Sequence, residues 1–306
     1  MDVFVQLTVA GLSDGAILAL AALGFVVVYK ASGVINFAQG HFLLVGAYVL
    51  VAAIVDWGLH WAVAVLVAIA AAVVLGLVVE RVMLRPLVGQ PIISVIMVTV
   101  GLTYVLAGLV LAIWGSAPRA LPAFIPTEPV EVAGTTIGEA RLWAIGLVVV
   151  VLVAFTIFFR RSRQGIAMRA VADDQQAALA MGISVRRVYA LAWALAGASA
   201  VAGGMILANM TSVSYELAAF GLLVFPVVIL GGLDSVLGVV VGGAVIGLLR
   251  QYSGFYLDRE LADVSIDGIA ENGITGTAEL VPYVALVLIL LVRPYGLFGQ
   301  RRIERV

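Results

Sequence analysis

The sequence predicts an all-α protein, a polytopic bundle of about eight or nine transmembrane helices in which some helices are broken or half-length. The chain of 306 residues is 63% hydrophobic but only 11% charged, whereas a soluble globular chain carries about 25% charged residues. Several apolar runs approach or exceed the roughly 20 residues that a helix needs to cross the hydrocarbon core. These runs do not alternate as the strands of a membrane β-barrel would.

The apolar runs predict nine membrane helices, near residues 4–29, 35–55, 61–79, 92–114, 142–159, 187–209, 217–232, 235–252 and 280–293. The pair at 217–252 has two interpretations: two half-length helices that meet at GGLDS, or one hairpin. No separate soluble domain is expected, so residues 1–306 are predicted to be a single transmembrane domain. Residues 1–29 lack a basic segment and a cleavage site, which favours a membrane helix over a signal peptide.

Arginine placement predicts the orientation in the membrane. Arginines gather near 81–85, in the loop at 160–187 and after residue 292, whereas the loops at 115–141 and 253–279 are mainly acidic. Short cytoplasmic loops are the ones enriched in Lys and Arg. We therefore expect a cytoplasmic loop at 160–187, external loops at 115–141 and 253–279, an external N-terminus and a cytoplasmic C-terminus.

A polar segment, SGVINFAQGHFLLVGAY, begins at Ser32 between two apolar runs. Irregular backbone survives at membrane depth only where it is buried in protein or lines a wet cavity, and a helix N-terminus there suits anionic solute groups. One hypothesis is a broken helix along a translocation path, with candidate path residues Asn36, Gln39, Gly40 and His41. The alternative is a cytoplasmic turn in which Asn36 and Gln39 are caps, and the residues alone leave both open.

Acidic residues and glycines add two further expectations. A carboxylate within a membrane is usually functional, but Asp14, Glu216 and Asp234 stand at predicted helix ends, which favours capping. The stretch GGLDSVLGVVVGGAVIGLL has glycines near four-residue spacing, and small residues at that spacing let membrane helices approach closely. This pattern predicts helix packing through Gly231, Gly232, Gly238, Gly242 and Gly243.

The loop at 160–187 contains RQGIAMRAVADDQQAALAMGISVRR, which is too polar and too short to span. Its spacing predicts one short helix over 167–182 that ends at Gly182 and has an apolar face of Met168, Val171, Ala172, Ala178 and Leu179. This helix has two interpretations: it rests on lipid, or it docks into a groove on a cytoplasmic partner. The pair Asp173–Asp174 argues against contact with anionic lipid.

Several classes of function are excluded by what the sequence lacks. There is no cysteine, which excludes disulfides and thiolate-bound metals. Lys30 is the only lysine and no G-x-x-x-x-G-K-[ST] occurs, so the chain has no P-loop for ATP. No nucleophile–base set or metal cluster is recognisable, and the net charge of −1 gives no nucleic-acid footprint. A pore or transporter remains, with neither enzymatic activity nor a cofactor of its own.

Four motifs, in this order over almost the whole chain, resemble the permease subunits of high-affinity branched-chain amino acid ABC importers: GVINFAQGHFLLVGAY, RAVADDQQAALAMGI, GGLDSVLGVVVGGAVIGLL and LLVRPYGLFG. The resemblance is closest to the shorter, H-type subunit. It implies an ABC importer permease of the bacterial inner membrane, surrounded by membrane lipid. The implied partners are a second, M-type permease, two cytoplasmic ATPase subunits that bind ATP and Mg²⁺, and a periplasmic solute-binding protein, with no nucleic acid.

The resemblance also implies roles for particular residues. The loop motif matches the family's coupling helix, which engages the ATPase, here through Arg169, Ala172, Asp174, Ala177, Ala178, Leu179 and Gly182. The resemblance also favours the interpretation of the break at 36–40 as part of a translocation path. Two features depart from the family: His41 replaces a usually acidic residue, and an acidic insertion at 257–280 precedes the last span.

Alternatives to branched-chain amino acid import remain at this point. Related permeases also serve urea, short amides and aromatic acids. A stand-alone channel or secondary transporter is a rival from another class, but the sequence lacks paired charges along the membrane path. A structural membrane scaffold would explain the glycines and leave the cytoplasmic helix unexplained.

Overall fold

The computed structural model describes residues 2–87, 90–126, 128–132, 135–262 and 275–299. Seven helical segments in these ranges are long and apolar enough to cross a membrane. They are α1 (Asp2–Ser32), α2 (Gln39–Val51) with η1 (Ala52–Asp56), α3 (Trp61–Val79) with η2 (Glu80–Leu84) and η3 (Arg85–Leu87), α4 (Ile92–Trp114), α5 (Glu139–Arg161), α8 (Val185–Met210), and α11 (Val236–Tyr252) with η4 (Ser253–Leu257) and α12 (Asp258–Leu261).

The remaining apolar helices are shorter than a membrane span. They are α9 (Leu217–Leu222) with α10 (Val224–Gly231), and α13 (Thr277–Val292). Together with the seven long segments, they confirm the predicted polytopic helical bundle. At GGLDS, the short α10 meets the long α11, and Gly232 turns the chain between them with φ +107°.

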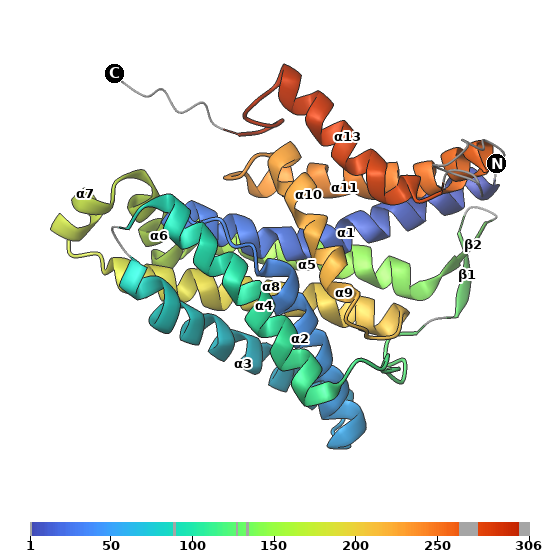
Figure 1. The fold of residues 1–306 in the computed structure, drawn as a ribbon, viewed down its shortest axis with the longest axis horizontal. Coiled ribbons are helices and arrows are strands. Elements are labelled where there is room, and N and C mark those ends of the chain that lie inside the picture. Colours follow the sequence, from blue (N-terminus) through green and yellow to red (C-terminus); the bar gives the residue numbers. More distant parts are fainter. Residues whose placement is uncertain (1, 88–89, 127, 133–134, 263–274, 300–306) are drawn as a thin grey trace, which may run out of the picture.

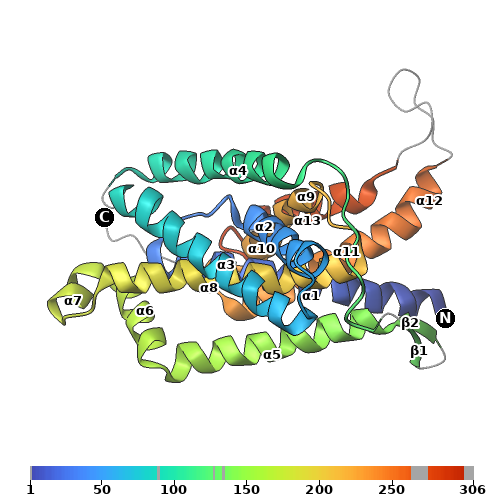
Figure 2. The ribbon, with the colours of Figure 1, turned by 90° about the horizontal axis from the view of Figure 1, so that it is seen from below.

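Helix α1 forms the centre of the bundle and packs between α8 and α11 (Figure 1). Every residue from Ile17 to Val28 is buried, as expected of a helix that is apolar on all sides. Helices α4 and α5 lie at opposite edges of the bundle, with α1 and α8 between them (Figure 2).

Glycines lie at the close contacts of α11. A Cβ added to Gly247 would lie 2.5 Å from the amide nitrogen of Gly15 in α1, and one added to Gly238 would lie 2.6 Å from the carbonyl carbon of Gly231. Gly243 likewise contacts Gly15. Of the other predicted packing glycines, Gly242 faces the backbone of Val227 and Gly232 faces that of Gly299.

The two ends of the bundle carry different connections (Figure 1). Near the N-terminus of α1 lies a hairpin of β1 (Pro129–Val132) and β2 (Thr135–Gly138), which pair antiparallel with Val130 opposite Ile137. At the far end lie α6 (Arg163–Asp173) and α7 (Gln175–Ala180). Following the predicted orientation, we call the hairpin end the outer end and the α7 end the inner end.

The predicted capping roles of Asp14 and Asp234 were wrong. Because α1 already begins at Asp2, Asp14 lies inside this helix, and it accepts a hydrogen bond from Gln251 Nε2 of α11 (2.7 Å). Ser235 caps α11 in place of Asp234, because its Oγ accepts from the amide of Gly238 (3.0 Å). Glu216 does occupy the N-cap position of α9, without a side-chain hydrogen bond there. Half of the 257–280 insertion, residues 263–274, lies outside the described residues.

Candidate translocation site

The chain turns back between α1 and α2 deep inside the bundle. Gln39, the first residue of α2, donates from Nε2 to the carbonyls of Ala21 in α1 (3.1 Å) and Ala196 in α8 (3.2 Å). Ala21 lies eleven residues before the inner end of α1, and Ala196 lies eleven residues after the inner end of α8. At 1.5 Å per residue, α2 therefore begins about 16 Å from the inner ends of its neighbours. This geometry fits a broken helix better than a turn at the membrane surface.

The polar side chains of the break are enclosed by protein. Asn36 and Gln39 are both 0% exposed. Asn36 donates from Nδ2 to Gln39 Oε1 (3.1 Å), and its Oδ1 accepts from the amide of Ala38 (3.0 Å). Buried amides are normally satisfied in this way. These bonds join α1, α2 and α8, and a contact of Asn36 or Gln39 with a solute stays a prediction.

Gly40 contacts Gly221 of α9 without any intervening side chain. A Cβ on Gly40 would lie 2.6 Å from the Cα of Gly221, and a Cβ on Gly221 would lie closer still to the Cα of Gly40. Neither position has room for a methyl group. The contact therefore fixes the short helix α9 on the first turn of α2, next to the buried His41.

A cleft of about 700 Å³ opens on the outer side of α9. It lies among α9, α11, α13 and the end of α8. Its charged residues are Glu216 before α9, Arg250 on α11 and Glu279 on α13, and Leu217, Phe220 and Tyr283 are among its apolar lining residues. Leu217 and Phe220 belong to α9, the helix that contacts Gly40, so α9 connects the wall of the cleft to the break.

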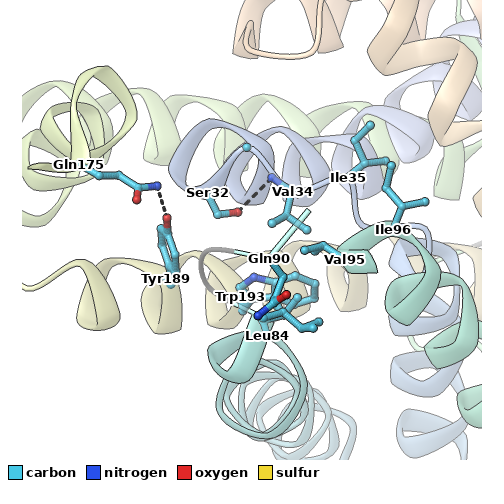
Figure 3. Close-up of a pocket in the computed structure, with 12 residues that line it drawn as sticks. Ser32, Val34, Ile35, Leu84, Gln90, Val95, Ile96, Gln175, Tyr189 and Trp193 are labelled. Carbon is cyan, nitrogen blue, oxygen red and sulfur yellow. Dashed lines mark hydrogen bonds between the residues drawn. The ribbon is translucent and has the colours of Figure 1, made fainter. Parts of the chain in front are cut away.

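A second pocket, of about 150 Å³, lies at the inner side of the break (Figure 3). The segment Ser32–Ile35 forms one wall, and Trp193 and Tyr189 of α8 form another. Tyr189 accepts a hydrogen bond through Oη from Gln175 Nε2 of α7. Helix α7, at the inner end, therefore contributes directly to the wall of this pocket. In the described conformation, the break and α9 separate the inner pocket from the outer cleft.

The segment that was predicted to be cytoplasmic differs from its prediction as one helix over 167–182. It forms two helices, α6 and α7, because Asp174 adopts an extended backbone (φ −154°) and caps α7, with Oδ1 accepting from the amides of Gln176 (2.8 Å) and Ala177 (3.0 Å). Gly182, at φ +78°, follows α7 in the left-handed conformation that often ends a helix.

The break at Asp174 also changes which apolar residues share a face. Ala178 is buried, but Leu179 is 57% exposed, so the predicted common face was wrong. Met168 and Val171 pack inside the chain against α1, α5 and α8. Of the other predicted coupling residues, Ala172 is half-buried, and the exposed ones are Arg169, Asp174, Ala177 and Gly182. The large apolar side chains that α7 and its end present outward are thus those of Leu179 and Met181.

Two residues of this site were not found from the sequence. Gly221 stands in AAFGLLVF without a spacing motif, so nothing marked its contact with Gly40. Arg250 did carry a signal: it is a lone arginine near the predicted outer end of an apolar run, where arginine is not expected from the orientation. An ionisable residue in such a place is a functional candidate.

Fold and site together define a multi-pass helical membrane protein in which a broken helix separates two opposed cavities. A family model described as "Branched-chain amino acid transport system / permease component" matches residues 7–292. The chain belongs to this family. It is a transport permease subunit of the ABC importer class and not an enzyme, which confirms the resemblance seen in the sequence.

Several relatives cover nearly the whole chain. The high-affinity branched-chain amino acid transport system permease protein LivH of Escherichia coli (strain K12) is 31% identical over 319 residues, covering 99% of this chain and 98% of the relative. The corresponding permease protein BraD of Pseudomonas aeruginosa is 28% identical over 317 residues, with the same coverage. A probable LivH of Methanocaldococcus jannaschii is 24% identical over 295 residues, covering 92% and 89%.

Proposed function

We propose that this permease moves branched-chain amino acids inward across a bacterial inner membrane as part of an ATP-driven importer. The observation that carries the proposal is the break at 32–41, which begins a helix at membrane depth between the outer cleft and the inner pocket. Non-helical backbone at that depth is typical of substrate paths in transporters. Membership of the family supports the solute class. Urea, short amides and aromatic acids are the alternative solutes.

The proposed partners are a second permease subunit, two cytoplasmic ATPases that bind ATP and Mg²⁺, and a periplasmic solute-binding protein. Support for the ATPase contact comes from α7, which lies at the extreme inner end of the bundle (Figure 1). Leu179 and Met181 are 57% and 81% exposed there, as suits residues that fill a groove on a partner. Because Gln175 joins α7 to Tyr189, movement of α7 would reach the inner pocket directly.

We expect Leu179→Asp to abolish both ATPase co-purification and uptake of radiolabelled L-leucine at unchanged membrane levels. An aspartate in an apolar groove would bury an unpaired carboxylate, which costs at least about 3 kcal/mol. The matched control is Gln164→Asp, which places the same charge on an exposed position of α6 and should leave both readouts near wild type. Equal ATPase recovery and uptake for the two variants would show that α7 only rests on lipid.

The proposed orientation puts the N-terminus outside and the C-terminus inside. The chain has no native cysteine, so single cysteines report sidedness without background. We expect an impermeant thiol reagent to label Ser116→Cys, which follows α4, in intact cells and to label Gln176→Cys only in inside-out vesicles. Both positions are exposed. The opposite labelling pattern would reverse the orientation.

A further inference from the structure

We infer that the outer cleft is a binding site for a zwitterionic solute with an apolar side chain. The inference deepens the proposed function and rests on it for the direction of entry. The cleft has about 700 Å³, within the range of about 300–1,000 Å³ typical of small-molecule sites. What identifies the ligand class is the arrangement of charge and apolar surface in its lining.

Arg250 supplies the cleft with a cation that forms no ion pair with the described residues. Its guanidinium lies over the ring of Phe220, 5.5 Å from the centroid. Among the residues that the structure describes, the only side-chain ion pairs are Arg85–Glu80 and Arg119–Asp56, and the buried Nε of Arg250 has no hydrogen-bond partner. Arginine binds carboxylates with two parallel hydrogen bonds. Arg250 is therefore available to a carboxylate ligand.

The acidic residues of the cleft restrict that ligand. Glu216 and Glu279 line the same cleft and form no ion pair with the described part of the chain. A simple anion would be repelled by these two carboxylates, and a simple cation would leave the Arg250 guanidinium without a partner. A solute that carries both a carboxylate and an ammonium group can satisfy both sets at once.

The rest of the lining fits a small amino acid. Leu217, Leu222, Leu223, Phe220 and Tyr283 provide apolar surface for a side chain, and hydroxyls come from Thr211, Ser212 and Ser214. Burial of apolar area then adds affinity that does not depend on charge. Because α9 forms the floor and rests on Gly40, a bound solute would lie next to the break.

The test measures protection of a cysteine in the cleft. The purified full-length chain carries Leu222→Cys, at a cleft position that is 54% exposed, and is held in lipid nanodiscs. L-leucine should slow maleimide labelling of this cysteine. Two analogues that keep the side chain should not: L-leucinamide lacks the carboxylate, and 4-methylpentanoate lacks the ammonium group. A cysteine at Leu237, exposed near the inner end of α11, should label at one rate in every condition.

Substitutions then assign the charges. In Arg250→Gln or Glu279→Gln, combined with Leu222→Cys, the concentration of L-leucine that gives half-protection should rise about tenfold or more, because a charge-assisted hydrogen bond is lost. Arg259→Gln, an exposed arginine of α12 that does not line the cleft, should leave it unchanged. The labelling rate without leucine shows whether each variant keeps its fold.

Each outcome decides the inference. The inference would be overturned if L-leucine failed to protect Leu222→Cys in the chain that keeps Arg250 and Glu279. Equal protection by L-leucine and by either analogue would also overturn it. So would unchanged protection in a folded Arg250→Gln variant. Because the analogues act on the chain with both charges intact, misfolding of a variant leaves the test decisive. Leucine uptake without protection would refute the cleft site and leave the import function intact. Protection without leucine uptake would support the cleft site and refute the import of leucine.

Discussion

Gly221→Ala is expected to abolish leucine uptake, although it adds a single methyl group. The new Cβ would overlap the Cα of Gly40, a backbone atom that no side-chain rotation can move away. Helix α9 must then separate from α2, and overpacking of this kind costs about 1–3 kcal/mol, occasionally more. The melting temperature of the purified chain and uptake in cells would both measure the effect.

The control for this experiment lies on α4. An added Cβ at Gly101 or Gly108 would meet nothing within 4 Å, and alanine favours a helix over glycine by up to about 1 kcal/mol. Gly101→Ala and Gly108→Ala should therefore melt no lower than wild type. Wild-type stability and uptake in Gly221→Ala would mean that α9 is not held against α2 in the working protein.

Gln39→Glu should prevent stable folding of the chain. The carboxylate would replace an Nε2 donor that serves two carbonyls, so a buried negative charge would face the oxygens of Ala21 and Ala196. An uncompensated buried charge costs at least about 3–5 kcal/mol, a large share of the roughly 5–15 kcal/mol that holds a typical domain folded. We expect little full-length protein in membranes and an aggregated elution profile after extraction.

Two companion variants separate charge from hydrogen bonding. Gln39→Met keeps the length of the side chain but leaves Asn36 Nδ2 without its partner, which costs about 1–3 kcal/mol, so its stability should be intermediate. Gln164→Glu makes the same charge change at an exposed site and should have no effect. If Gln39→Glu accumulated like wild type, the amide bonds could not be what holds the break.

Most membrane helices could be predicted because hydrophobic length is a local property. The run at 92–114 coincides with α4, and the runs at 187–209 and 235–252 lie within two residues of α8 and α11. The start of α2 was placed four residues early, at 35. Residues 35–38 are apolar enough to continue a helix, but the bonds of Asn36 hold them in a turn.

The failures arose where contacts outside the local pattern decide the structure. The capping aspartate at 174 splits the helix predicted over 167–182. This signal is present in the sequence, but the prediction gave more weight to the apolar spacing. Asp14 was assigned to a helix end because its partner, Gln251, lies 237 residues away. The contact of Gly40 with Gly221 is also long-range. The sequence therefore predicted the break as a candidate site and a helix near 217–232, but not the contact through which α9 covers the break.

The hydrogen bond from Gln39 to Ala196 joins residues 157 positions apart, which has a consequence for biogenesis. At about 5–20 residues per second, the ribosome needs about 8–30 s to reach Ala196 after it has made Gln39. During that interval Gln39 can pair with Ala21 and Asn36 but not with α8. The pair of helices α1 and α2 therefore has an incompletely satisfied side-chain amide in the lipid. Insertion of α8 is therefore the step that completes the N-terminal half. Chains that stall before it should be substrates for membrane quality-control proteases.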